Sequence, residues 1–295
     1  MFKRLKNVRH WTPRWVLVQC LHYVLRRYNK QFRFLLCENM DFLKETLKYA
    51  LHDELPKLRI PTIKTAEETV DELLSRRVSI VRFGDGEIDT MMGRPNVFQQ
   101  PNPMLAERLK AILSSHHPDI LIGLYRSYYH PNTRCDLEQM LSSYQHREFL
   151  NTFIKQDNVY YDTCLSMPFN CNLNKDAYYQ KLRQLWEKRN VVVICGRYTF
   201  KYLRYNIFDN AAEVRYQYAP EREAFAEYDA ILKQALTIDK QSLVVVILGT
   251  TATVLAYDLA LKGYQALDLG HIAKSYDYFK QHKPIDEHFF SWDLK

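Results

Sequence analysis

The sequence predicts an α/β protein in which helices cover both faces of a mostly parallel sheet, with a helical arm at the N-terminus. Three observations support this fold class. Short apolar runs rich in β-branched residues recur along the chain, as expected of strands that are buried on both faces. Helical patterns separate most of these runs, which is typical of parallel α/β sheets. The 295 residues are 47% hydrophobic and include only 8 glycines, a composition that fits an ordered globular protein.

Six apolar runs are the expected strands, and polar or turn-forming residues bound each of them. They cover residues 78–83, 120–125, 191–195, 214–218, 243–248 and 265–269. Apolar residues at helical spacing predict helices at residues 105–113, 135–152, 176–188, 200–208, 221–237 and 253–261. A capping-box-like start at Thr65 and Glu68 predicts one more helix, which ends near residue 75. Residues 157–175 show no clear period and are expected to form a loop.

Residues 1–55 form the expected arm, which differs in charge from the expected main domain at residues 56–295. Nine cations and no acid lie before residue 38, so subtracting them from the net charge of +7 leaves −2 for the rest of the chain. Polar residues interrupt the apolar runs of the arm well short of the ~20 residues that a membrane span needs, and no signal-peptide cleavage pattern follows them. Two interpretations stay open. The arm packs on the body or on a sister subunit, or it lies as a basic, aromatic helix on an anionic membrane surface.

The charge and the cysteines restrict the partners and the compartment. Because the main body is nearly neutral, it need not carry the basic face of a nucleic-acid-binding domain, and we expect no specific nucleic-acid partner. Six scattered cysteines without a Cys-x-x-Cys pair argue against a zinc site or a disulfide framework and favour a reducing compartment. The expected location is therefore cytoplasmic, or peripheral on the inner face of the membrane if the arm docks there. A homo-oligomer is the other partner that the arm allows.

Polar residues gather where the predicted strands end. In an open α/β sheet, ligands bind at the carboxyl ends of the strands. The residues after the runs include carboxylates, arginines, two threonines and a histidine: Asp85 and Glu87, Arg126, Arg197, Thr250 and Thr251, and His271. Such a set can hold a metal ion together with a phosphate group.

Asp85 and Glu87 lie one residue apart just past a strand, with Gly84 and Gly86 beside them. Two such carboxylates can turn toward one hard cation, and Mn²⁺ or Mg²⁺ prefers oxygen ligands that phosphates and water complete. The glycines let the backbone approach a ligand closely and adopt turn conformations that other residues resist. Arg82 adds a planar fork suited to phosphate. The alternative is an ordinary polar turn with solvated carboxylates.

The run that starts at Gly249 lies between a strand and a helix and resembles an anion-binding helix N-terminus. Backbone N–H groups, the helix dipole and the hydroxyl of Thr250 or Thr251 all suit a phosphate there. The run lacks the Gly-Lys-Ser/Thr ending of a P-loop, so it is no NTPase signature. The alternative is plain N-capping by one of the two threonines.

Three further residues are candidates by their position after strands. His271 is a candidate metal ligand, phosphate partner or general base, with a structural histidine as the alternative. Arg126 and Arg197 are candidate phosphate partners, and surface salt bridges are the alternative for both.

Two motifs give the chain a family resemblance. The first is Val-Arg-Phe-Gly-Asp-Gly-Glu at residues 81–87, followed by Phe-Gln-Gln at residues 98–100. The second is Gly-Thr-Thr-Ala-Thr-Val-Leu-Ala-Tyr-Asp-Leu-Ala at residues 249–260, followed by Gly-Tyr-Gln-Ala-Leu-Asp-Leu-Gly-His at residues 263–271. Both resemble the GT-D-type glycosyltransferases, and the middle segment at residues 208–225 is similar more weakly. The resemblance covers about residues 65–280.

The resemblance implies a Rossmann-like fold and a glycosyltransferase of the hexosyltransferase type. Its donor would be a nucleotide-diphosphate sugar, expected to be a UDP-sugar, and Asp85 and Glu87 would serve a divalent metal. The metal would neutralise charge on the leaving diphosphate, and Arg82 and the loop at Thr251 would share that task. A carboxylate or a histidine would deprotonate the acceptor hydroxyl. Asp268 is the first candidate for this base, beside His271.

The expected acceptor is a glycan, a glycolipid or other lipid-linked acceptor, or a glycoprotein, in surface polysaccharide or glycoconjugate synthesis. The chain departs from the family pattern at Thr250, where the family usually has Pro, at residues 273–275, where acidic residues are usual, and after Gly196. Two other function classes remain. One is a different metal-dependent enzyme that acts on a nucleotide or a phosphate ester, and the other is a non-catalytic module that docks on a membrane or nucleic acid through the arm.

Overall fold

The computed structural model describes residues 61–126 and 145–285 apart from Asn172, together with Leu17, Cys20 and Phe289. Apart from Leu17 and Cys20, the predicted arm at residues 1–55 lies outside the described residues, as does much of the predicted helix at residues 135–152. The chain divides into two compact units, and the helices and strands named here belong to the unit made of residues 59–130 and 145–295.

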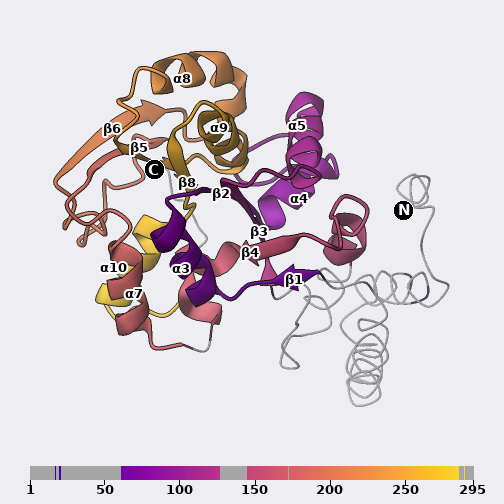
Figure 1. Ribbon diagram of the computed structural model, residues 1–295. Coiled ribbons are helices and arrows are strands. Elements are labelled where there is room, and N and C mark those ends of the chain that lie inside the picture. Colours follow the sequence, from indigo (N-terminus) through magenta and orange to yellow (C-terminus); the bar gives the residue numbers. More distant parts are fainter. Residues whose placement is uncertain are drawn as a thin grey trace, which may run out of the picture. The chain divides into compact units, whose positions relative to one another are not determined.

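One sheet of eight parallel strands runs through the described part of the chain (Figure 1). Every pair of neighbouring strands is parallel. From one edge to the other, the order is β1 (Thr62–Ile63), β4 (Val159–Asp162), β3 (Ile120–Leu124), β2 (Ser79–Phe83), β8 (Gln265–Asp268), β7 (Leu243–Ile247), β5 (Asn190–Gly196) and β6 (Glu213–Ala219).

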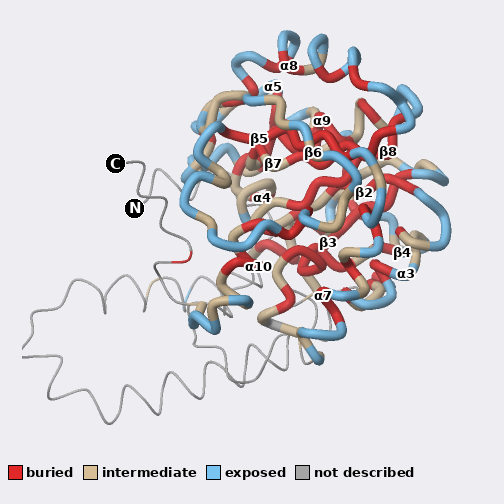
Figure 2. Tube along the Cα trace, turned by 90° about the vertical axis from the view of Figure 1, so that its left-hand side faces the viewer, coloured by how far each residue is buried: buried red, intermediate tan, exposed pale blue. Residues whose placement is uncertain are grey.

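Helices cover both faces of this sheet, and a hydrophobic cluster lies under each layer (Figures 1 and 2). In β2, Val81 and Phe83 belong to one cluster and Ile80 to the other, because alternate side chains of a strand point to opposite faces. The predicted α/β fold with a parallel sheet between two helical layers is therefore confirmed. The first layer holds α4 (Asp85–Met91), α5 (Pro103–Leu113), α8 (Tyr228–Ala235) and α9 (Thr250–Leu261), and the second holds α3 (Ala66–Arg76), α7 (Lys175–Arg183) and α10 (Ile272–Lys280).

The six predicted strands are present with bounds within one residue of those expected. The apolar pattern does not predict β1 or β4. β4 lies in the segment expected to be a loop. The pattern misses this strand because its sequence is Val-Tyr-Tyr-Asp and its first residue, Val159, is exposed.

One helix prediction is wrong, and two helices are absent from the predicted set. Residues 200–208 form turns rather than a helix. The buried carboxylate of Asp277 in α10 accepts hydrogen bonds from the backbone N–H groups of Arg204 and Tyr205, at 2.8 and 3.0 Å, and so holds this segment in a different conformation. α10 is also missed, as is α4, which is seven residues long and has Gly86 as its second residue, a residue that disfavours helices.

The chain leaves the neighbouring strands β2 and β8 toward opposite faces of the sheet. α4 follows β2 into the first helical layer, and α10 follows β8 into the second. In open α/β sheets, ligands bind at the carboxyl ends of strands where the connections diverge in this way. Within the described segments, no helix combines the length and the apolar character that crossing a membrane requires.

Candidate active site

Asp85 and Glu87 lie in the first turn of α4, directly after β2. Oε2 of Glu87 accepts a hydrogen bond from the N–H group of Gly84 at 2.8 Å, and Oδ1 of Asp85 accepts one from the N–H group of Gly86 at 3.0 Å. Both carboxylates therefore stand at the positive end of a helix, where negative charge is stabilised. Asp85 is exposed and Glu87 is half-buried, so the pair faces the end of the sheet from a fixed turn.

Gly86 lies at the contact between α4 and α9 and does not form a special turn. It is helical, and the glycines with positive φ among the described residues are Gly93, Gly249, Gly263 and Gly270. A Cβ atom on Gly86 would lie 3.5 Å from Cγ2 of Thr250. The first turns of α4 and α9 are therefore in close contact, which brings the two predicted motifs together.

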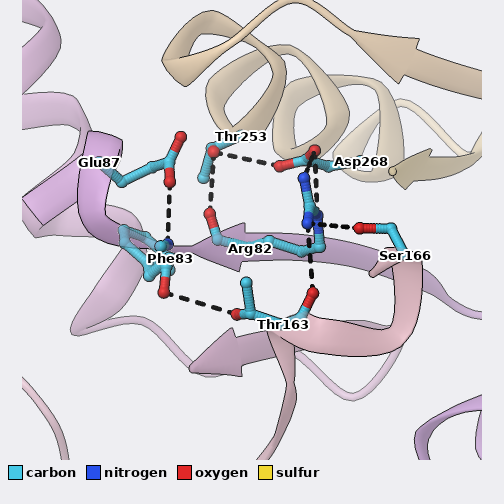
Figure 3. A network of polar contacts seen from close by, with 8 residues as sticks. Arg82, Phe83, Glu87, Thr163, Ser166, Thr253 and Asp268 are labelled. Carbon is cyan, nitrogen blue, oxygen red and sulfur yellow. Dashed lines mark hydrogen bonds and ion pairs between the residues drawn. The ribbon is translucent and has the colours of Figure 1, made fainter. Parts of the chain in front are cut away.

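Arg82 is held by an ion pair and two further hydrogen bonds inside the protein (Figure 3). Its Nε and Nη2 donate to Oδ1 of Asp268 at 3.2 and 3.0 Å. Nη1 donates to the carbonyl oxygen of Thr163 at 3.2 Å and to Oγ of Ser166 at 2.8 Å. Because every nitrogen of the guanidinium has a protein partner, the geometry favours a role in positioning the end of β2 over the predicted contact with phosphate.

Asp268, the ion-pair partner of Arg82, is buried. Its side chain is 3% exposed, and Oγ1 of Thr253 in α9 lies 3.2 Å from its second oxygen and 3.0 Å from the carbonyl oxygen of Arg82. Burial raises the pKa of Asp268, and the cation of Arg82 opposes this. Because it is buried and paired with Arg82, Asp268 is poorly placed for the role of general base that the sequence suggests.

Gly270 makes room for the ion pair. A Cβ atom at this position would lie 2.0 Å from Nη2 of Arg82, and the φ angle of Gly270 is +44°. Side chains rarely adopt such a backbone conformation. Gly270, Thr163, Ser166 and Thr253 are functional candidates that the sequence analysis does not single out, although Thr253 and Gly270 lie in the second motif.

Two carboxylates and one cation lie close enough to Glu87 to change its pKa. Burial, followed by the negative charge of Asp268, raises the pKa of Glu87 to about 7, and Asp85 acts in the same direction. The N–H group of Gly84 and the cation of Arg82 oppose this rise. A bound cation would relieve the repulsion among these carboxylates.

The residues present fit a divalent cation that takes only part of its coordination from the protein. The described residues hold no group of three or more His, Cys, Asp and Glu side chains placed to bind a metal. Mg²⁺ and similar ions are commonly held by one or two carboxylates, with substrate phosphates and waters as the remaining ligands. Asp85 and Glu87 are suited to such a shared site.

The N-terminus of α9 is built without a side-chain cap. Its N-cap residue is Gly249, with φ +52°, and a Cβ atom there would lie 3.0 Å from Cβ of Phe98. Thr250 and Thr251 are buried inside the first turn, and Oγ1 of Thr250 has no hydrogen-bond partner among the described residues. The alternative of N-capping by a threonine is therefore wrong. The buried hydroxyl and the helix dipole leave this end suited to an anion.

His271 stands at the same edge, directly before α10. Its ring centre lies 6.2 Å from that of Phe98 and 6.0 Å from that of Phe289. Burial, with the cations of Arg82 and Lys274 as smaller causes, lowers the pKa of His271 to about 4. The imidazole is therefore neutral at physiological pH and can accept a proton or a hydrogen bond.

The two remaining arginine candidates contact other parts of the edge. Arg126 follows β3, and its cation opposes the rise that burial causes in the pKa of Asp162 at the end of β4. The guanidinium of Arg197, after β5, lies over the ring of Tyr218 in β6, 5.2 Å from the ring centre. The described contacts thus join Arg82, Glu87 and Asp268, but place neither Arg126 nor Arg197 in that network.

Comparisons with known proteins agree with this arrangement. A family model described as "Glycosyltransferase GT-D fold" matches residues 80–287. The probable glycosyl transferase Gly of Streptococcus gordonii is 29% identical over 262 residues, which cover 81% of this chain and 37% of that protein. The glycosyltransferase GlyD of Streptococcus pneumoniae serotype 4 is 27% identical over 269 residues, which cover 86% of this chain and 33% of that protein. The chain thus spans about a third of the length of these curated relatives.

Solved structures show the same similarity in three dimensions. A domain of unknown function 1792, described as having a distinct glycosyltransferase fold, matches with a TM-score of 0.72 and 27% identity, over 84% of this chain and 94% of that one. A glycosyltransferase with the same domain from Streptococcus sanguinis matches with a TM-score of 0.66 and 27% identity, over 80% of this chain and 94% of that one.

Proposed function

Because the chain belongs to the GT-D-fold glycosyltransferase family, we propose that it moves a sugar from a nucleotide-diphosphate sugar to a hydroxyl group of an acceptor, with Mn²⁺ or Mg²⁺ as cofactor. The expected nucleotide is UDP, and the expected sugar is a hexose. The observation that carries the proposal is the meeting of two helix N-termini. Gly86, between the two carboxylates of α4, lies against Thr250 in the uncapped first turn of α9, so a cation held by α4 and a diphosphate held by α9 would have adjoining places.

Each part of this site has a role that follows from its chemistry. Asp85 and Glu87 would hold the cation, which when bound neutralises charge on the leaving diphosphate. The backbone N–H groups and the Thr250 hydroxyl at the start of α9 would bind phosphate oxygens. The Arg82–Asp268 pair would keep the ends of β2 and β8 in register, and thereby orient the carboxylates.

We propose that His271, rather than Asp268, takes up the proton of the hydroxyl group that receives the sugar. Asp268 is buried and paired with Arg82, whereas His271 is neutral at physiological pH. The pKa of His271 is depressed partly by neighbouring cations. A bound diphosphate would bring the opposite charge and raise that pKa toward the range useful for a general base.

The acceptor and the place of action follow from the sequence-based expectations. We propose a glycan, glycolipid or glycoprotein acceptor in surface polysaccharide or glycoconjugate synthesis. The predicted membrane contact of the arm lies outside the described residues and stays a prediction. A lipid-linked acceptor on the inner face of a membrane would give such a contact a purpose.

A donor panel with and without metal tests the proposal. The protein is incubated with UDP-glucose, UDP-galactose and other nucleotide sugars, an oligosaccharide acceptor, and Mn²⁺ or EDTA. We expect donor cleavage that requires both the acceptor and the metal, together with a labelled product. Metal-dependent donor cleavage at the same rate without acceptor would instead indicate an enzyme that acts on phosphate esters. Absence of cleavage with every donor would reject the proposal.

A further inference from the structure

A hollow lies at the carboxyl edge of the sheet, at the ends of β5 and β6. It has a volume of about 280 Å³. We call it the tyrosine hollow and define it by its lining residues, which are Arg197, Tyr198, Tyr218, Ala219, Pro220 and Glu221. None of the roles proposed above uses it.

Two exposed tyrosines line this hollow. Tyr198 is 44% exposed and Tyr218 is 48% exposed, while Tyr202 and Tyr205 close by in the sequence are 67% and 42% exposed. Among the described residues, these four are the only exposed tyrosines. Large rings that gather in solvent at one place mark a binding surface.

The rings are held in place by contacts with the core. Tyr218 stacks on Tyr216, with ring centres 6.2 Å apart and an angle of 6° between the planes. Tyr216 in turn packs edge-on against Phe200 at 5.2 Å, and both lie against the hydrophobic cluster under the second helical layer. The platform is therefore formed before any ligand arrives.

Glu221 forms the opposite wall through a close approach to Gly196. A Cβ atom on Gly196 would lie 2.6 Å from Cγ of Glu221. Oε1 of Glu221 accepts a hydrogen bond from the backbone N–H group of Tyr198 at 3.2 Å. The carboxylate and the backbone of Tyr198 thus hold each other, and the absence of a side chain at Gly196 permits this.

The chemistry of the walls selects a neutral, polyhydroxylated ligand. The guanidinium of Arg197 lies over the ring of Tyr218, and Nζ of Lys201 lies over the ring of Tyr198, 4.9 Å from its centre. The tyrosine hydroxyls, these cations and the carboxylate of Glu221 can bind the hydroxyl groups of a sugar. Among the lining residues, Arg197 and Glu221 carry one charge of each sign. From this complementarity we propose that the tyrosine hollow is an outer subsite for a saccharide acceptor, an inference that rests on the proposed transferase function.

The loop at residues 98–100 connects the hollow to the carboxylate site. The N–H group of Glu223, two residues after Glu221, donates to the carbonyl oxygen of Phe98 at 2.8 Å. The carboxylate of Glu223 accepts from Nε2 of Gln99 and from the N–H group of Gln100, both at 2.7 Å. The other side of Phe98 packs on Gly249 at the start of α9. The hollow and the start of α9 are therefore joined through the loop at residues 98–100.

The strand order fixes how long such an acceptor must be. β5 and β6 are three and four strands away from β2, which at ~4.8 Å per strand places the hollow roughly 14–19 Å from the carboxylates. A single sugar cannot bridge this span, so the subsite should favour oligosaccharides over monosaccharides.

Direct binding tests the subsite without donor or metal. Saturation-transfer NMR on the full chain is run with cellotetraose, maltotetraose and chitotetraose. We expect signal transfer to at least one tetrasaccharide, with loss of that signal in Tyr198→Ala and Tyr218→Ala. Tyr202→Ala, which removes an exposed tyrosine outside the hollow, is the matched control and should keep it. No signal with any of the three, or equal signals in all variants, would overturn the proposal.

Kinetics separate the acceptor from other occupants. Tyr218→Ala should raise the KM for an oligosaccharide acceptor by about 10-fold and leave the donor KM and the use of a monosaccharide acceptor unchanged. A higher donor KM would assign the ring to the nucleobase, and loss of a dimer in ultracentrifugation would assign it to a second copy of the chain. Either result overturns the subsite. Tetrasaccharide binding without any sugar transfer would instead reject the proposed function and leave the subsite standing.

Discussion

At the carboxyl edge of the sheet, polar side chains are buried at one end and exposed at the other. At β2 and β8, Arg82 and Asp268 are buried against each other, with 13% and 3% of their side chains exposed. At β5 and β6, the rings of Tyr198 and Tyr218 stand in solvent. A buried ion pair cannot exchange partners without leaving a charge unpaired, so the first end is rigid. The exposed rings at the second end are accessible to a ligand, while the contact of Tyr218 with Tyr216 holds the platform in place. In this chain, the chemistry is assigned to the buried end and recognition to the exposed end.

Removing a charge from the buried end should have the largest effect on stability. Asp268→Ala leaves the guanidinium of Arg82 buried without its carboxylate, and should lower the free energy of unfolding by about 3–5 kcal/mol. Tyr218→Ala at the exposed end should lower it by less than about 1 kcal/mol. Urea unfolding followed by circular dichroism measures both changes.

A double variant shows whether the charge or the packing causes this loss. Arg82→Met combined with Asp268→Leu removes both charges and should recover part of the stability, because no ion is left unpaired. If the double variant were less stable than Asp268→Ala, or if Tyr218→Ala lost as much as Asp268→Ala, the contrast between the two ends would be wrong.

Removing a carboxylate from α4 should reduce activity while the fold stays intact. Asp85→Asn and Glu87→Gln each take away one proposed ligand of the cation. We expect kcat/KM to fall by more than about 100-fold, since changes to groups that merely support metal ligands already cost 10–100-fold. Assays across a range of Mn²⁺ concentrations measure this, with the thermal midpoint as the control for folding. Near-normal turnover in both variants would show that Asp85 and Glu87 do not serve the proposed function.

The sequence predicts the features that are determined by residues close together in the chain. The β-branched runs give six strands within one residue, and the Asp85–Glu87 motif needs only its own turn to be recognised. The pairing of Arg82 with Asp268 joins residues 186 positions apart, and no local pattern encodes it. Thr163 and Ser166 escape notice for a related reason, since they lie in a short 3₁₀ turn within a segment that has no period.

The errors have equally specific causes. The aromatic residues at 200–208 are spaced as on a helix, yet hydrogen bonds to Asp277, 72 residues further along, hold them in turns. Gly86 looks like a turn glycine in the sequence, whereas it is helical and packs on Thr250. The position that needs a glycine is Gly270, because the side chain of Arg82 fills its neighbourhood.

A pair of glycine variants sharpens the contrast by separating backbone strain from crowding. Gly270→Ala combines a positive φ with a Cβ atom 2.0 Å from Nη2 of Arg82, and should destabilise the fold by about 2–3 kcal/mol. Gly263→Ala is the matched control, since its φ of +83° is strained as well while its Cβ atom would meet only Nζ of Lys240 at 3.8 Å. This control should lose about 1 kcal/mol. Equal losses in urea unfolding would show that Arg82 moves aside easily and that the pair is not rigid.

The buried side of the edge also includes β4, where Asp162 makes the stability of the fold depend on pH. Burial is the main cause that raises the pKa of Asp162 to about 6, from an ordinary value of 3.8, while Arg126 and the N–H group of Cys164 oppose the rise. The folded state therefore holds this proton more firmly than the unfolded state does. The stability gained in this way is fully present below about pH 4 and is lost as the pH rises through 6.

Asp162→Asn should therefore stabilise the protein above pH 6 and not at pH 4. The amide oxygen can still accept the hydrogen bond that Oδ1 of Asp162 accepts from the N–H group of Cys164 at 2.9 Å, and the buried charge is gone. We expect a gain of about 1 kcal/mol at pH 7.5, smaller than two pKa units at ~1.4 kcal/mol each, because the new amide N–H groups need acceptors in a buried place. Asp239→Asn is the control, as Asp239 is exposed and makes the same kind of bond to Gln241 at 3.0 Å. Thermal unfolding between pH 4 and 8 should show the gain growing with pH for Asp162→Asn alone. A gain that is independent of pH would mean that packing, rather than the buried charge, limits stability at this end of the sheet.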